Sequence, residues 1–276
     1  MTTPNLLTAR DSNIFTITFN REDKMNAMTA SFLADLKAAL DSVKYDDGVS
    51  VVVLKATGKA FTTGYDLDGS DWILSQNPIE MGGRLNIDRD REDIKTILEY
   101  WWTMWKFPKP IIAQVQGLCL SGGGELIAMC DLVVAAETAK FGHPAGRDLG
   151  IPPTVFLWPM LIGMKKTREF LYTARLFSAT EAERLGLINR VVPLDDLEKT
   201  VDDLAADVAK TPVNNLAILK QATSRFYENM GLFASGDQAA ELDAVFHQSE
   251  SFVSFFSTVA EHGVQAALAE RRKRFG

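Results

Sequence analysis

The sequence has few of the residues that most often build metal centres and disulfide frameworks. Its 276 residues include only two cysteines and three histidines. Cys119 and Cys130 do not have the spacing of a metal-binding or redox motif, and neither do His143, His247 and His262. We therefore expect no metal site, and we interpret both cysteines as small buried hydrophobes in a reducing cytoplasm.

Basic charge and long apolar runs are also scarce. The net charge is −7, and only Arg271–Arg274 is strongly basic, so the clustered Lys and Arg of a nucleic-acid-binding protein are missing. No run of about 18 apolar residues is long enough to span a bilayer. The N-terminus also lacks the positive start and apolar centre of a secretory signal. We expect neither nucleic acid nor membrane as a partner.

Apolar periodicity predicts alternating strands and helices in the first half of the chain. Residues 13–19 alternate like a strand, and 29–45 have the spacing of an amphipathic helix. Residues 49–56 are almost uniformly apolar, which is typical of a strand covered on both faces. Further buried strands are expected at 111–115 and 131–136. The fold class is therefore α/β, with a layered core.

The second half is predominantly helical. Helical spacing begins near Thr154, and the capping box Ser178–Glu181 predicts the start of another helix. A last short strand is expected at 187–192, and helical periodicity then continues to the end. We predict two parts, an α/β core over residues 1–193 and a helical region over 194–276.

The stretch Gln116–Leu126 is the centre of the predicted chemistry. Three glycines are expected at a strand-to-helix turn, where they allow positive φ and close approach of a ligand to the main chain. Free N–H groups at the first turn of a helix suit an oxygen that gains negative charge, and Glu125 follows one turn in as a possible base. The structural alternative is a helix packed tightly on a strand, with Glu125 complementing the helix dipole.

A second glycine-bearing stretch, 58–67, follows the predicted strand 49–56. Open α/β sheets usually bind ligands beyond the carboxyl ends of their strands, although two glycines are also typical of a plain turn. The irregular segment 69–93 is a candidate lid. The helix expected from Ile94 to Trp105 is apolar nearly all round. It could line an acyl or aromatic pocket, although we favour core or subunit-interface packing.

Several separated stretches resemble, in order, the motifs of the crotonase superfamily, the enoyl-CoA hydratase and isomerase family. Asn20–Met28 is similar to the early loop that helps to seat coenzyme A. Ala60–Leu67 resembles the first oxyanion-hole motif, and Gln116–Asp131 resembles the second. Ala182–Val192 fits a later family segment. The resemblance spans about residues 5 to 275.

This resemblance implies a fold, an assembly and a site. The fold would be a ββα spiral core with a C-terminal helical trimerisation region, assembled as a homotrimer or a dimer of trimers. The backbone N–H groups of Tyr65 and Gly122 would bracket the thioester oxygen of an acyl-CoA, with Glu125 as principal base. No cofactor would be bound permanently, since coenzyme A arrives as part of the substrate. The residues that the resemblance assigns to coenzyme A are Lys24, Met25, Ala27, Ala60, Thr62, Gly64, Tyr65, Asp66, Leu67, Leu118 and Gly122.

One departure from the family pattern concerns the second acid. Family hydratases carry a second glutamate just after the motif that here reads Phe141–Pro144, and this chain has Ala145 there. Family isomerases often place an acid a few residues later, where this chain has Thr154. The one acid in the loop is Asp148, which is our candidate for the second acid.

Three interpretations remain open. The first is hydration of a 2-enoyl-CoA with Glu125 and possibly Asp148. The second keeps the coenzyme A site but isomerises the double bond or hydrolyses a carbon–carbon bond, with His143 and Asp148 polarising water; His143 could equally be a loop residue bonded to a backbone carbonyl. The third is a non-enzymatic paralogue. The basic Arg271–Arg274 could meet the phosphates of coenzyme A or remain solvated.

Overall fold

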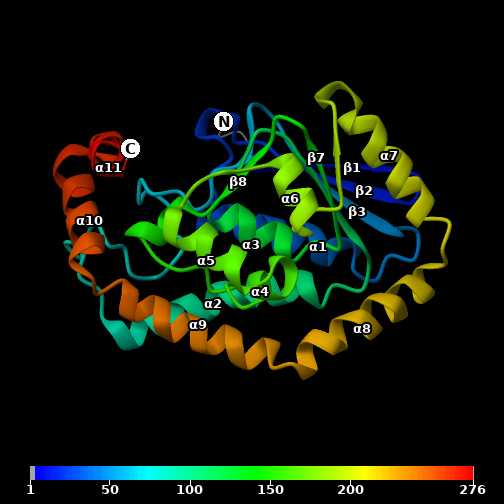
Figure 1. Cartoon of the computed structure of the whole chain (residues 1–276). Helices are drawn as coiled ribbons and strands as arrows, with labels where there is room; N and C mark the ends of the chain where they lie inside the picture. The colour runs from blue at the N-terminus through cyan, green and yellow to red at the C-terminus, as the bar shows by residue number, and fades with distance from the viewer. Residues whose placement is uncertain (1–3, 276) are drawn as a thin grey trace.

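Two β-sheets form the centre of the protein (Figure 1). The computed structural model describes residues 4–275. The strands are β1 (Leu6–Asp11), β2 (Ile14–Phe19), β3 (Val51–Ala56), β4 (Ala60–Thr62), β5 (Ile111–Val115), β6 (Leu118–Leu120), β7 (Leu132–Ala136), β8 (Lys140–Gly142), β9 (Phe177–Ser178) and β10 (Arg190–Val192). One sheet has the order β1-β2-β3-β5-β7-β10, and the other has the order β4-β6-β8-β9.

The chain winds between these two sheets as a spiral. Each of β3, β5 and β7 is followed directly by a short strand of the other sheet, namely β4, β6 and β8. Strands β2, β3, β5, β7 and β10 run parallel, as do β4, β6 and β8, whereas β1 and β9 pair antiparallel at the edges. The expected spiral α/β core is therefore confirmed.

Two helices begin where the sequence predicted. Thr29 caps the first helix by accepting a bond from the amide of Phe32 at 3.2 Å, and Ser178 caps α6 by accepting from Glu181 at 3.1 Å. The helices are α1 (Ala30–Val43), α2 (Ile87–Trp105), α3 (Gly122–Ala128), α4 (Leu157–Ile162), α5 (Met164–Thr173), α6 (Ala179–Leu185), α7 (Leu197–Val208), α8 (Val213–Asn229), α9 (Leu232–Phe246), α10 (Glu250–His262) and α11 (Val264–Phe275).

The larger sheet is buried on both faces, as the apolar run at 49–56 predicted. Val51 and Val53 point into a cluster with α7, and Val52 and Leu54 point into the main core. Successive strand residues face opposite sides of a sheet, so this alternation assigns α7 to one face and α1 to the other. The core between the two sheets holds the ends of β4 and β6 in fixed positions.

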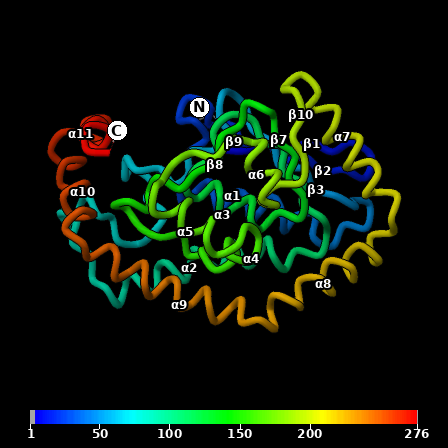
Figure 2. Tube along the Cα trace, viewed as in Figure 1, coloured from blue at the N-terminus to red at the C-terminus, as the bar shows by residue number. Residues whose placement is uncertain are grey.

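The last helices pass around one side of the core (Figures 1 and 2). The chain runs from α7 through α8 and α9, and α10 and α11 rise at the opposite end of the molecule. Helix α9 packs along α2. No helix within residues 4–275 combines the length and the apolarity that crossing a bilayer requires.

Two local predictions were wrong. The glycines do lie at a strand-to-helix turn, but the strand before them is β6 and not the predicted strand at 111–115, because the three residues of β6 are too few to show a period. The irregular segment ends before residue 93, because Asn86 caps α2 by accepting a bond from the amide of Arg89 at 3.0 Å, and α2 begins at Ile87.

Candidate functional site

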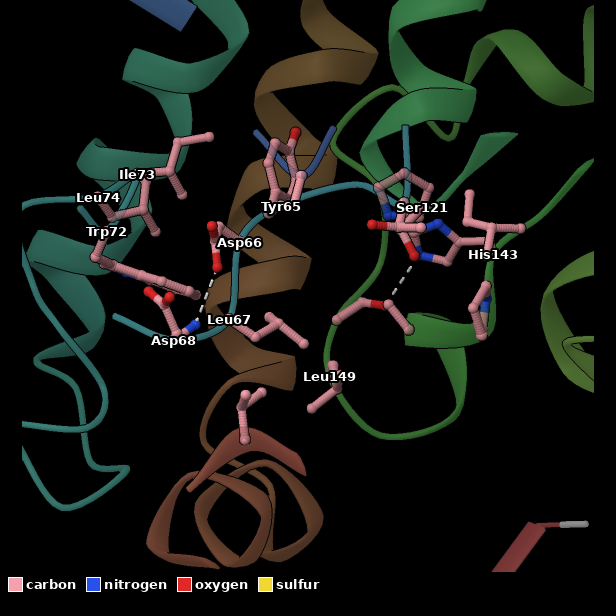
Figure 3. Close-up of a pocket in the computed structure, with 18 of the residues that line it drawn as sticks. Tyr65, Asp66, Leu67, Asp68, Trp72, Ile73, Leu74, Ser121, His143 and Leu149 are labelled. Carbon is pink, nitrogen blue, oxygen red and sulfur yellow. Dashed lines mark hydrogen bonds between the residues drawn. The ribbon is translucent and has the colours of Figure 1, made fainter. Parts of the chain in front are cut away.

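A cavity of about 490 Å³ lies between the spiral core and the last helices. Figure 3 shows Trp72, Ile73 and Leu74 on one side and Ser121 and His143 on the other. The lining of the cavity is mostly apolar, and its acidic side chains are Asp23, Asp66, Asp68, Glu125 and Asp243. The walls come from the loops 23–27, 63–74 and 143–153, from α2 and α3, and from α9, α10 and α11.

Two bends of the main chain meet at this cavity. Gly64 has φ +95°, and a Cβ on it would lie 2.8 Å from the Cβ of Ser121 and 3.1 Å from the backbone nitrogen of Gly122. The bend after β4 therefore touches the bend after β6, with no room for a side chain between them. Within residues 4–275, the amides of Tyr65 and Gly122 donate to no protein acceptor.

No glycine of α3 has positive φ, which corrects the sequence prediction, and Gly122 and Gly123 instead allow close packing of neighbouring side chains. The residue with an unusual backbone is Ser121, at φ 50° and ψ −118°, whereas Gly122–Gly124 are helical. A Cβ on Gly122 would lie 2.7 Å from the Cε of Met28 and 3.0 Å from the Cζ of Tyr65. A strained backbone such as that of Ser121 persists where the surrounding structure fixes it, and such residues often lie at functional sites.

Glu125 lies in the first turn of α3 and is fully buried. The hydroxyl of Tyr65 donates to its Oε1 at 3.0 Å, and the hydroxyl of Thr154 donates to its Oε2 at 3.4 Å. Burial raises the pKa of Glu125 to about 8, although both hydrogen bonds favour the carboxylate. Glu125 is therefore mostly protonated at neutral pH and titrates in the range useful for acid–base chemistry.

The side chain of Tyr65 contacts Glu125, which the sequence did not indicate. Its motif pointed only to its backbone N–H, yet its hydroxyl is the shortest polar contact of Glu125. Burial and the charge of Glu125 raise the pKa of Tyr65 well above its ordinary value, so the phenol remains a donor. A periodicity signal could not reveal this contact, because Tyr65 and Glu125 lie 60 residues apart.

His143 lines the cavity as a buried, neutral imidazole. Its Nε2 lies 3.4 Å from the carbonyl of Gly150, and its Nδ1 has no partner in the described chain. Burial lowers its pKa to about 4, so the ring carries no charge near neutral pH. Its contact with a backbone carbonyl matches the loop role that we considered.

Asp148 is not among the residues that line the cavity. Both of its carboxylate oxygens accept from Nε of Arg271, at 2.7 and 3.0 Å, and another guanidinium nitrogen of Arg271 donates to the carbonyl of Pro144. Burial raises the pKa of Asp148, and the Arg271 charge opposes that effect. Asp148 therefore joins the 143–153 loop to α11.

The residues assigned to coenzyme A fall into two groups. One group lines the cavity: Lys24, Met25, Ala27, Tyr65, Asp66 and Leu67. The other group holds the bends in place: Ala60 pairs with Leu118 between β4 and β6, and Thr62 donates to the carbonyl of Asn26 at 2.7 Å. Gly64 and Gly122 form the contact between the bends.

Both the sequence and the fold are similar to those of known proteins. Residues 9–275 match the sequence profile of the enoyl-CoA hydratase/isomerase family. The chain is 29% identical to a short-chain-enoyl-CoA hydratase of Clostridium acetobutylicum, over 98% of this chain and 96% of that one. It is 30% identical to an enoyl-CoA hydratase/isomerase of Xanthobacter autotrophicus Py2, with a TM-score of 0.88 over 100% of both chains.

A further solved structure extends the likeness of fold at lower identity. The enoyl-CoA hydratase of Mycobacterium smegmatis superimposes with a TM-score of 0.90 at 24% identity, covering 99% of this chain and 94% of that one. The family profile runs through both glycine-bearing bends, Glu125 and all of the C-terminal helices. The chain therefore belongs to the enoyl-CoA hydratase/isomerase family.

Proposed function

We propose that this protein hydrates a 2-enoyl-CoA, with the thioester oxygen held between the amides of Tyr65 and Gly122 and with Glu125 as the acid–base group at the α carbon. The observation that carries the proposal is the contact between the two bends beside Glu125. Both amides are without a protein acceptor among residues 4–275, and Glu125 lines the same cavity. Coenzyme A enters as part of the substrate, and no permanently bound cofactor is needed.

The geometry supports enolate chemistry in the following way. Attack of water at the β carbon moves the electrons of the double bond to the thioester oxygen, where two preorganised donors stabilise the negative charge. Glu125, protonated because of its burial, then gives its proton to the α carbon. In the reverse direction the carboxylate of Glu125 takes that proton back as a base.

The seat for coenzyme A would be the loop that carries Lys24, Met25 and Ala27. Asn26 is fully buried and fixes this loop by donating to the carbonyls of Thr57 and Ala60, both at 2.9 Å. This anchoring leaves Lys24 at the cavity, where an ammonium group can meet a phosphate.

Glu125→Gln is the direct test of the proposed function. The amide keeps the shape of the side chain but cannot exchange a proton, so we expect hydration of short 2-enoyl-CoA substrates to fall by about 10²–10⁴. Loss of the conjugated-thioester absorbance measures the rate, and calorimetry with a saturated acyl-CoA measures binding. Glu137→Gln makes the same change at an exposed position and should leave both unchanged. Normal hydration by Glu125→Gln would remove Glu125 from the mechanism.

Because Ala145 replaces the second family glutamate, isomerisation and carbon–carbon bond hydrolysis are the alternatives to hydration. A single acid that removes a proton and returns it to another carbon isomerises a double bond, and hydrolysis of a carbon–carbon bond is a further option at the same site. Mass gain by one water indicates hydration or hydrolysis, and solvent deuterium uptake without added water indicates isomerisation. Inactivity with every thioester would favour the non-enzymatic paralogue.

We also propose that the protein assembles as a homotrimer or a dimer of trimers. Helix α8 exposes the large apolar side chains of Ile218, Leu219 and Phe226, and Met230 directly after it is exposed as well. Exposed apolar side chains concentrated on one helix are typical of a subunit interface. Light scattering on the eluted protein measures the mass, and a monomer at micromolar concentration would contradict this assembly.

A further inference from the structure

Three titratable side chains form a buried cluster on the helical wall of the cavity. His247, the residue directly after α9, places its Nδ1 2.8 Å from Oδ2 of Asp90 on α2, and its Nε2 3.5 Å from Oδ1 of Asp243, one turn earlier on α9. Asp90 is fully buried, and Asp243 and His247 are 6% and 8% exposed. No motif or periodicity in the sequence pointed to these residues.

The hydrogen bonds of this cluster are incomplete. Oδ1 of Asp243 accepts from the amide of Ile151 at 2.8 Å, but within residues 4–275 its Oδ2 accepts from no donor. Oδ1 of Asp90 is likewise buried without a partner there. A buried carboxylate is costly unless its oxygens are satisfied, so packing alone does not favour this arrangement.

The cluster opens on the same cavity as Glu125. Asp243 and His247 both line that cavity. The negative charge of Asp243 is near enough to raise the pKa of both Glu125 and Tyr65. The bond from the amide of Ile151 also joins Asp243 to the 143–153 loop, which is where family hydratases carry their second acid.

We propose that Asp243 is the second acid–base residue of the hydration reaction and that His247 and Asp90 are positioning residues for its carboxylate. This inference rests on the proposed function. Asp243 reaches the cavity from α9 and takes over the role that Ala145 cannot perform. The Nε2 of His247 lies beside Oδ1 of Asp243, and Asp90 fixes the imidazole through its contact with Nδ1. The Oδ2 of Asp243 is then available to a water molecule.

The step balances in protons and electrons. The carboxylate of Asp243 takes a proton from water while the water oxygen bonds to the β carbon. The π electrons become the enolate of the thioester, and Glu125 gives its proton to the α carbon as the enolate collapses. One water has been added, and transfer of the proton from Asp243 to Glu125 restores both groups.

The environments of the two carboxyls match these roles. Burial raises the pKa of Asp243 to about 6, an effect that charged His247 opposes and Asp90 reinforces, so Asp243 is mostly ionised at neutral pH. Burial lowers the pKa of His247, but the charge of Asp243 and the hydrogen bond and charge of Asp90 outweigh it, so the net effect is a raised pKa that favours the imidazolium beside them. The pKa of Glu125 is about 8, so an ionised base and a protonated acid face the substrate together.

The test uses the full-length protein with Asp243→Asn, an isosteric change. We expect kcat for 2-enoyl-CoA hydration to fall by about 10²–10⁴ with KM within about threefold, and the loss of activity below about pH 6 to disappear. Asp237→Asn, an exposed position on the same helix, is the matched control. Asp90→Asn and His247→Gln should each lower kcat by about tenfold and should change the pH at which activity is lost on the acidic side of the profile.

A second reaction separates a catalytic role from a structural one. Exchange of the α proton of a saturated acyl-CoA with deuterium oxide requires Glu125 and the two amides, but no attacking water. Asp243→Asn should therefore retain this exchange within about threefold. Full hydration by Asp243→Asn, or joint loss of hydration and exchange, would overturn the inference. Wild-type protein that does not hydrate enoyl-CoA would refute the proposed function itself, and the role of Asp243 would fall with it.

Discussion

The two walls of the cavity are built in different ways. On the core wall, Tyr65 and Ser121 come from two short bends that follow β4 and β6, and Glu125 comes from the first turn of α3, directly after the second bend. On the helical wall, Asp90 and His247 meet although they lie 157 residues apart in the chain. The core wall uses main-chain groups fixed by paired strands, and the helical wall uses side chains fixed by helix packing.

This difference separates the two chemical needs of an enolate reaction. Amides held by strand ends give a rigid site for an oxygen that gains charge, and they need no particular side chain. Proton transfer needs side chains with shifted pKa values, and α3 and α9 bring Glu125 and Asp243 to the cavity from opposite walls. Substitutions on the two walls should therefore change different kinetic quantities.

The largest effect in this comparison is expected from Gly122→Ala. The added Cβ would lie 2.7 Å from the Cε of Met28 and 3.0 Å from the Cζ of Tyr65, so both side chains must shift at the point where the two bends meet. We expect kcat to fall by about 10², the scale of losing one oxyanion donor. Initial rates of hydration measure this.

The neighbouring glycine supplies the control for that substitution. A Cβ on Gly124 meets only Trp158, at 3.5 Å, which is ordinary contact. Gly124→Ala should retain activity and stabilise α3 by about 0.5–1 kcal/mol. Equal losses of activity in Gly124→Ala and Gly122→Ala would contradict the role assigned to the contact between the bends.

Tyr65→Phe should have the next largest effect. The hydroxyl of Tyr65 favours the carboxylate of Glu125, so its removal should raise the pKa of Glu125 further above about 8. Because hydration uses protonated Glu125, the fall in activity at high pH should move to higher pH. The rate at neutral pH should drop about tenfold, since the hydroxyl no longer stabilises the carboxylate that forms as Glu125 gives up its proton.

A pH–rate profile measures both effects of Tyr65→Phe. Tyr172→Phe removes a hydroxyl from a side chain that is 75% exposed and should leave the profile unchanged. If activity falls at the same alkaline pH in Tyr65→Phe as in the wild type, that fall is not caused by deprotonation of Glu125.

Much of the fold followed from local patterns. The helix at Ala30–Val43 combines helical spacing with a threonine cap, and β3 shows the uniform apolar run of a strand covered on both faces. The short strands β4, β6 and β8 were missed, because three residues do not establish a period. These strands decide where both bends end.

The site was predictable only where its residues are contiguous. The two bends and Glu125 lie in short motifs, so the sequence indicated them together. The contact of Tyr65 with Glu125 and the Asp90–His247 pair depend on packing between distant elements. The sequence indicated Asp148 as the second acid because it is the one acid in its loop. Its side chain instead points to Arg271, and periodicity carries no information about the direction of a loop side chain.

Asp148→Asn tests which carboxylate is the second acid, and we expect a smaller effect on catalysis. Loss of its two contacts with Arg271 should lower the free energy of unfolding by about 1–3 kcal/mol while changing hydration only a few-fold. Chemical denaturation and kcat measure the two quantities. A loss of activity of 10² or more with normal stability would return Asp148 to the role that the sequence indicated.

The smallest effect is expected from the basic end of α11. Because Arg271 is occupied by Asp148, the remaining charges are Arg272, Lys273 and Arg274, on a helix that lines the cavity. If they attract the phosphates of coenzyme A, changing all three to Gln should weaken binding of a saturated acyl-CoA about two- to fivefold at low salt. This difference should vanish at high salt, where exposed charges are screened. The double variant Lys199→Gln/Lys210→Gln, at exposed positions on α7 and just after it, should remove charge without this effect. Binding of the triple variant equal to that of the wild type at every salt concentration would show that the tail is a solvated helix end.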